Sequence, residues 1–170
     1  MLPRRILTSD NVPLCARFGE WLSRVGRTIA DSYLGFRYLA NSQESVEVGE
    51  VAFSFLTDEH GFRNASPWPD QADIVTVGDS LTFGYGVSDG QAWPSLVAEA
   101  VTPNRLINLA LSGMAPQQYF RVFETLGIPL RPKLVILGLF PGNDLHDARV
   151  FNAWVEAGSP GDYNVQRLFG

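Results

Sequence analysis

Residues 74–84 of the chain read Ile-Val-Thr-Val-Gly-Asp-Ser-Leu-Thr-Phe-Gly, and this segment predicts the first strand of the core and the turn that follows it. It opens with four apolar or β-branched residues in a row, which is typical of a parallel strand buried on both faces. Apolar runs at residues 106–109 and 134–140 predict two more strands, and the spacing at residues 91–101 and 116–127 predicts a helix before each of them. This alternation predicts an α/β fold with a parallel sheet covered by helices on both faces.

Small, polar or flexible residues follow each predicted strand. Ser80 follows the first strand, Gly113 the second and Asn143 the third. Because ligands bind at the carboxyl ends of parallel strands, we expect these residues to lie at one edge of the sheet. The Ser80 hydroxyl is a candidate nucleophile, and the Gly113 N–H and the Asn143 amide are candidate donors to an oxyanion. Each also has a structural explanation, as a helix N-cap, a turn glycine and an Asx-turn respectively.

Taken together, these segments resemble the SGNH (GDSL-type) family of serine esterases and acyl hydrolases. The resemblance rests on the sequence Gly-Asp-Ser-Leu at residues 78–81, Asn-Leu-Ala-Leu-Ser-Gly at residues 108–113 and Gly-Asn-Asp at residues 142–144, and it spans residues 51–150. Residues 57–64, Thr-Asp-Glu-His-Gly-Phe-Arg-Asn, are similar to the segment that leads into this domain in bacterial members.

This resemblance implies a three-layer α/β/α sandwich with a flavodoxin-like sheet order. It implies that Ser80 is the nucleophile and that the N–H groups of Ser80 and Gly113, with the Asn143 amide, hold the oxyanion. The implied reaction is ester hydrolysis through an acyl-enzyme, or O-acetyl transfer when a carbohydrate hydroxyl accepts the acyl group. Asp79 and Asp144 are expected to fix loops rather than carry protons. Aromatic residues near the strand ends are candidate pocket walls, with core packing as the alternative: Phe83, Tyr85, Trp93 and Phe140.

The histidine base of this family has no counterpart at the expected place. In the family it lies in an Asp-x-x-His motif after two further strands, and the chain contains no such motif. Its two histidines are His60, in a turn before the first core strand, and His146, which is the nearer candidate. We therefore expect a C-terminally truncated domain whose third strand forms an apolar edge prone to self-association. A catalytically inert fragment or a binding domain is the alternative.

Residues 1–50 are expected to form an extension of a partial hydrolase domain at residues 51–170. Residues 1–30 carry five arginines and two acidic residues, whereas the rest carries 8 basic and 16 acidic residues. Apolar residues at helical spacing predict an amphipathic basic helix over residues 14–29, which packs on its own domain or, alternatively, lies on a membrane surface. The pattern of residues 46–57 predicts a β-hairpin that turns near Gly49.

Composition excludes several classes of protein. The chain has 170 residues, of which 45% are hydrophobic and 18% charged, so one globular domain is expected. A net charge of −5 argues against nucleic-acid binding, and one cysteine with two histidines argues against a metal site. No cofactor is implied, because the Gly84-Tyr85-Gly86 sequence lacks the spacing of a nucleotide-binding loop. Neither a signal peptide nor a membrane span is visible, so the cytoplasm is the default location. The family resemblance makes a small-molecule, carbohydrate or lipid ester the expected partner.

Overall fold

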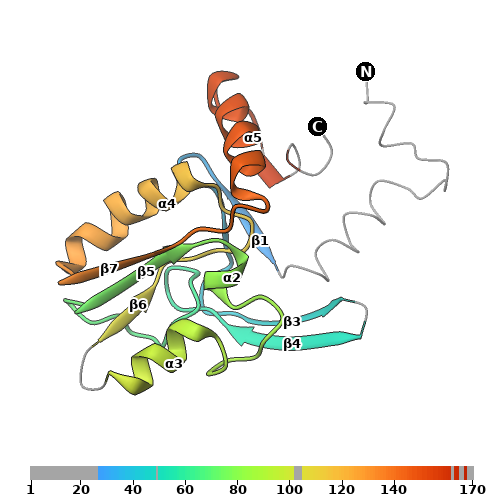
Figure 1. Ribbon diagram of the computed structural model, residues 1–170. Helices are drawn as coiled ribbons and strands as arrows, with labels where there is room; N and C mark the ends of the chain where they lie inside the picture. The colour runs from blue at the N-terminus through green and yellow to red at the C-terminus, as the bar shows by residue number, and fades with distance from the viewer. Residues whose placement is uncertain (1–26, 49, 102–104, 162, 165–166, 168–170) are drawn as a thin grey trace.

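The centre of the computed structural model is a three-stranded parallel sheet in the order β6-β5-β7 (Figure 1). The structure describes residues 27–48, 50–101, 105–161, 163, 164 and 167. All five residues of the central strand are buried. The three strands are β5 (Ile74–Gly78), β6 (Leu106–Asn108) and β7 (Leu134–Gly138). The prediction of a mixed α/β fold with a parallel sheet is therefore confirmed, and the second and third strands end earlier than predicted.

Helices cover both faces of this sheet. Figure 1 shows α4 on one side of the sheet and α3 on the other. Proline begins α4, where its fixed φ suits the first helical turn. The helix predicted over residues 116–127 is α4 followed by a π-helical turn, η1. The elements are α2 (Ser80–Phe83), α3 (Trp93–Ala100), α4 (Pro116–Val122), η1 (Phe123–Gly127), η2 (Ile128–Leu130) and α5 (Asp144–Glu156). None of the described helices is both long and apolar enough to cross a membrane.

Two antiparallel hairpins precede the sheet. The hairpin β3–β4 turns between Val48 and Val51, as predicted. The hairpin β1–β2 was not predicted, and Ile29, which the sequence places on the face of a helix, lies in β1 instead. The helix predicted over residues 14–29 is therefore wrong at its C-terminal end, and residues 14–26 lie outside the described residues. The strands are β1 (Thr28–Asp31), β2 (Gly35–Tyr38), β3 (Gln43–Val48) and β4 (Val51–Leu56).

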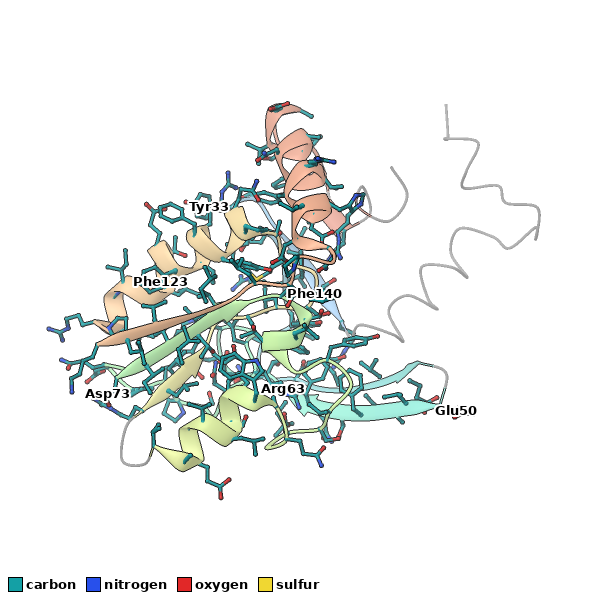
Figure 2. All side chains as sticks on the ribbon, viewed as in Figure 1. Tyr33, Glu50, Arg63, Asp73, Phe123 and Phe140 are labelled. Carbon is teal, nitrogen blue, oxygen red and sulfur yellow. The ribbon has the colours of Figure 1, made fainter. Side chains whose placement is uncertain are left out.

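The buried side chains of the hairpins and of the sheet belong to one hydrophobic core. Tyr38 of β2 stacks on Phe83 of α2 with ring centroids 5.1 Å apart, and Phe55 of β4 meets Phe83 edge-on at 5.0 Å. Such aromatic pairs contribute about 0.5–1.5 kcal/mol each beyond the area they bury. At the other end of the core, the Tyr33 hydroxyl donates to Glu124 at 2.8 Å, and Figure 2 shows Tyr33 above α4.

A pair of glycines allows α2 to lie directly on the strand ends. Gly78 of β5 pairs in register with Gly138 of β7. A Cβ atom on either glycine would collide with Oγ1 of Thr82, which is buried in α2. The Thr82 side chain therefore occupies the space that two side chains would otherwise fill, and this contact fixes the position of α2 and of its first residue, Ser80.

The outer edge of β7 is apolar and open. Among the described residues, β7 pairs with β5 alone. Leu134 is 50% exposed and Leu137 is 53% exposed. Exposed apolar side chains run along this strand and past its end: Leu134, Val135, Leu137, Leu139 and Phe140. The edge of β6 differs, because the Asn64 side chain accepts a hydrogen bond from the Asn108 N–H (2.7 Å) and donates one to the Asn108 carbonyl (3.0 Å).

We predict that Gly138→Ala destabilises the protein by about 1–3 kcal/mol, because the new methyl group overlaps Oγ1 of Thr82. Thr82→Ala removes that oxygen, so the double variant should recover most of the loss. Urea denaturation of the two single variants and the double variant gives the coupling energy. Additive costs would show that the glycine pair does not set the position of α2.

We also predict that the protein self-associates through β7. Leu137→Lys places a charge on the open edge and should shift the population toward monomer in size-exclusion chromatography with light scattering. Leu96→Lys is the matched control, because Leu96 is 51% exposed on α3. Equal shifts for both variants, or a monomeric wild-type protein, would contradict this prediction.

Candidate active site

Ser80 is the first residue of α2 and lies at the carboxyl end of the central strand. The N-cap of α2 is Asp79, whose Oδ1 accepts the Leu81 N–H at 2.9 Å. Ser80 is therefore not the capping residue, and its hydroxyl is not used to begin the helix. Its Oγ lies 3.5 Å from Oδ2 of Asp79, at the long limit of a hydrogen bond, and the residue is half-buried. This leaves the hydroxyl accessible at the edge of the sheet.

The loop that carries Gly113 is tied to the rest of the site by Asn108. The Asn108 Oδ1 accepts from the Thr76 hydroxyl at 2.9 Å, and its Nδ2 donates to the Thr82 carbonyl at 3.0 Å. Gly113 is buried with a φ of +89°, a conformation that L side chains rarely adopt. The Asn108 side chain thus links the segment at residues 108–113 to α2, and the segment ends in a buried peptide free of a Cβ.

Asn143 is the N-cap residue of α5, but its side chain does not cap the helix. Instead, Nδ2 donates to Oδ2 of Asp147, one turn later, at 2.9 Å. The expected Asx-turn is therefore not what orients this side chain. An amide nitrogen carries two hydrogens, so one remains to donate to a ligand. The Oδ1 atom is buried and has no hydrogen-bond partner among the described residues.

Tyr119 of α4 joins the Gly113 loop to the Asn143 loop. Its hydroxyl lies 2.9 Å from Oδ1 of Asp144 and 3.2 Å from the Met114 carbonyl. Burial raises the pKa of Tyr119 and the Asp144 carboxylate raises it further, so the phenol stays protonated and donates. The other carboxylate oxygen of Asp144 accepts the Phe140 N–H at 2.8 Å. Through these contacts Asp144 holds the loop after β7 against α4.

The three loops thus meet at one edge of the sheet. Ser80 and Asn143 follow neighbouring strands whose ends are in register. Asn108 contacts Thr82, and Tyr119 contacts both Met114 and Asp144, so the segment that carries Gly113 is linked to both other loops. Burial raises the pKa of the Asp79 carboxyl, and the Asp144 carboxylate raises it further, so these two groups lie within electrostatic reach. Figure 2 shows Phe140 at this edge, at the end of β7.

Neither histidine is held against Ser80. His146 is exposed in the first turn of α5, and among the described residues its side chain makes no hydrogen bond. The ring of His60 packs on Trp68 with centroids 4.3 Å apart. Phe83, a candidate pocket wall, is fully buried in the core instead. A cavity of about 630 Å³ lies between α3, β6 and residues 63–69, and its lining does not include Ser80, Gly113 or Asn143.

Sequence analysis missed the role of Arg63. The Arg63 side chain is 4% exposed and lies between the rings of Phe55 and Phe83, at 5.6 and 5.5 Å from their centroids. It donates to the carbonyls of Gly84 and Val87, both at 2.8 Å, and so holds the loop that follows α2 and the candidate nucleophile Ser80. This loop includes the Gly84-Tyr85-Gly86 sequence. Figure 2 shows Arg63 between this loop and α3.

Buried Asp58 organises the remainder of the segment that leads into the domain. Its Oδ1 accepts the N–H groups of His60 and Phe62, at 2.8 and 2.9 Å. Its Oδ2 accepts from the side chains of Asn64 and Trp68, at 2.8 and 2.6 Å. The hydrogen bonds of Asp58 therefore fix the conformation of the segment at residues 57–64. Apart from the family resemblance, the composition of this segment did not predict that structural role.

Sequence analysis also missed Arg167 and Asp147. The Arg167 Nε lies 3.5 Å from Oδ1 of Asp147, and the Asp147 side chain is 5% exposed. A Cβ atom on Gly113 would collide with Nη1 of Arg167 and lie 2.7 Å from its Cζ, so the guanidinium contacts the Gly113 main chain. No pattern in the sequence connects residue 167 with residue 113, because the contact forms through tertiary structure.

We predict that Asp79→Asn does not destabilise the protein at neutral pH. The raised pKa of Asp79 means that its charged form is disfavoured in the folded state. The free energy of unfolding should therefore fall as pH rises from the ordinary Asp value of about 3.9 through the raised pKa. Asparagine caps a helix as well as aspartate does, so the variant keeps the bond to Leu81 and should be the more stable protein at pH 7.

Urea denaturation as a function of pH checks this prediction, with exposed Asp70→Asn as the control. The advantage of Asp79→Asn should shrink as pH falls toward 4, where the wild-type carboxyl becomes protonated. A variant less stable than wild type by the same amount at every pH would count against it.

No family model matches this chain, and no curated protein matches it.

Proposed function

We propose that the protein is a serine ester hydrolase of the SGNH type that works through an acyl-enzyme. The observation that carries the proposal is the meeting of three loops, which bear Ser80, Gly113 and Asn143, at the carboxyl edge of one parallel sheet. A hydroxyl at a strand end, on loops that also carry a side-chain amide and a peptide free of a Cβ, supplies the nucleophile and the oxyanion donors of an acyl transfer.

The proposal includes the finer description of the fold. The strand order β6-β5-β7 places the first core strand between the second and the third, as in a flavodoxin-like sheet. Helices lie on both sides of the sheet, as a three-layer α/β/α sandwich requires (Figure 1). These features support membership of the SGNH family, together with the motifs at residues 78–81, 108–113 and 142–144.

In the proposed mechanism, Oγ of Ser80 attacks the carbonyl carbon of an ester. The N–H groups of Ser80 and Gly113 and the free N–H of Asn143 Nδ2 stabilise the negative charge on the carbonyl oxygen. The alcohol leaves with a proton, and water then releases the acyl group from Ser80. When a carbohydrate hydroxyl takes the place of water, the same acyl-enzyme carries out O-acetyl transfer.

The proton acceptor for Ser80 is the open part of this mechanism. Among the described residues, no hydrogen bond joins His60 or His146 to the hydroxyl, whose partner is Asp79. Enzymes that lack one member of a triad retain an acceleration of about 10³–10⁴ over water, from the oxyanion hole and substrate binding. The proposal therefore gives the chain slow turnover, which an added base should raise. The same observation favours the second candidate, an inert binding domain.

We predict that the purified protein hydrolyses p-nitrophenyl acetate and that Ser80→Ala abolishes the excess over buffer. Imidazole in the assay should accelerate the wild-type protein more than Ser80→Ala, because it supplies a base to the serine. A fluorophosphonate probe should add to Ser80, as located by mass spectrometry of the digested protein.

Ser45→Ala is the matched control, because Ser45 is an exposed serine of β3. It should hydrolyse the ester at the wild-type rate. Equal rates for wild type and Ser80→Ala, together with no probe on Ser80, would reject the esterase and leave the inert binding domain.

A further inference from the structure

The oxyanion site proposed above lies among buried carboxylates, which oppose the formation of a negative charge. Asp79, Asp144 and Asp147 are each less than 5% exposed. All three raise the pKa of the Tyr119 hydroxyl through their charge, so they lie within electrostatic reach of one point. An oxyanion that forms beside them is stabilised only where positive charge or donors outweigh their field.

The donors already bound to these carboxylates reduce that field in part. Asp144 accepts from the Tyr119 hydroxyl and the Phe140 N–H, and Asp79 accepts from the Leu81 N–H. Asp147 accepts from the Asn143 amide. These donors are neutral, so they satisfy hydrogen bonds without cancelling charge. Within the described part of the chain, Arg167 is the one cation in an ion pair with any of the three carboxylates.

Arg167 is placed where such a cation would act. Its Nε faces Asp147, and its two Nη atoms lie against the main chain of Gly113. Asp147 therefore contacts two proposed parts of the oxyanion site at once, because one oxygen holds the Asn143 amide and the other holds the guanidinium. The Arg167 side chain remains 23% exposed, so a ligand can reach it.

We propose that Arg167 is a catalytic residue of this site, whose guanidinium supplies the positive charge that stabilises the oxyanion at Gly113. Asp147 is its positioning residue and sets the orientation of both Asn143 and Arg167. The guanidinium donates hydrogen bonds and transfers no proton, so the serine still needs a separate base. This inference rests on the proposed function and extends it, because it predicts a binding site for tetrahedral anions at Gly113, Asn143 and Arg167.

The first experiment measures kcat and KM for p-nitrophenyl acetate, with the Ser80→Ala rate subtracted. Arg167→Gln should lower kcat about tenfold to a hundredfold with little change in KM, because the charge acts in the transition state. Arg167→Lys should recover part of the loss. Guanidinium added well below denaturing concentrations should restore activity to Arg167→Gly. Arg149→Gln, an exposed arginine of α5, is the matched control and should behave as wild type.

The second experiment measures anion binding without turnover. Inorganic phosphate should raise the thermal unfolding temperature of Ser80→Ala, and this rise should be lost in Ser80→Ala/Arg167→Gln and kept in Ser80→Ala/Arg149→Gln.

The two experiments separate the two proposals. Equal hydrolysis by wild type and Ser80→Ala rejects the esterase, while the phosphate measurement still decides the anion site. Unchanged kcat in Arg167→Gln, or a phosphate effect that survives the loss of Arg167, overturns the role of Arg167. A kcat loss that neither lysine nor guanidinium restores also overturns it, because the arginine would then act only by holding the fold.

Discussion

The described structure depends on the close approach of α2 to the ends of β5 and β7. Gly78 and Gly138 lie opposite each other, and the Thr82 side chain fills the space above both. A Cβ atom on either glycine would push Thr82 away from the sheet. The two glycines therefore set the distance between the sheet and α2, the helix that begins with Ser80. The position of the candidate nucleophile is thus set by two missing side chains.

Buried polar side chains also hold the loops in place, because they supply hydrogen bonds that regular secondary structure would otherwise provide. Asp58 and Arg63 together satisfy main-chain and side-chain groups of two long loops, and Arg63 is buried between aromatic rings. Removing either partner of such a network leaves unpaired groups in the core, which costs more than the bonds themselves contribute. The loops near Ser80 are irregular in shape but fixed in position.

The features that the sequence predicted are those with a local cause. The core strands follow from unbroken apolar runs, and the β3–β4 hairpin follows from alternation around Gly49. By contrast, β1 is four residues long, and Ile29 fits the spacing of a helix as well as that of a strand. The candidate site residues could be proposed because each follows a strand end. Arg63 and Arg167 could not, because their contacts with Gly84 and Gly113 join residues far apart in the chain.

The Asn64 side chain makes the sheet asymmetric. By pairing with the main chain of Asn108, it occupies the edge of β6 at the point where another strand would begin to bond, whereas no strand within the described ranges pairs with the outer edge of β7. A sheet with two open edges can extend without limit, as a fibre does. A sheet with one open edge joins a single neighbour through that edge. Among the described residues β7 gives the central sheet such an edge, so association through this sheet ends at a pair of chains.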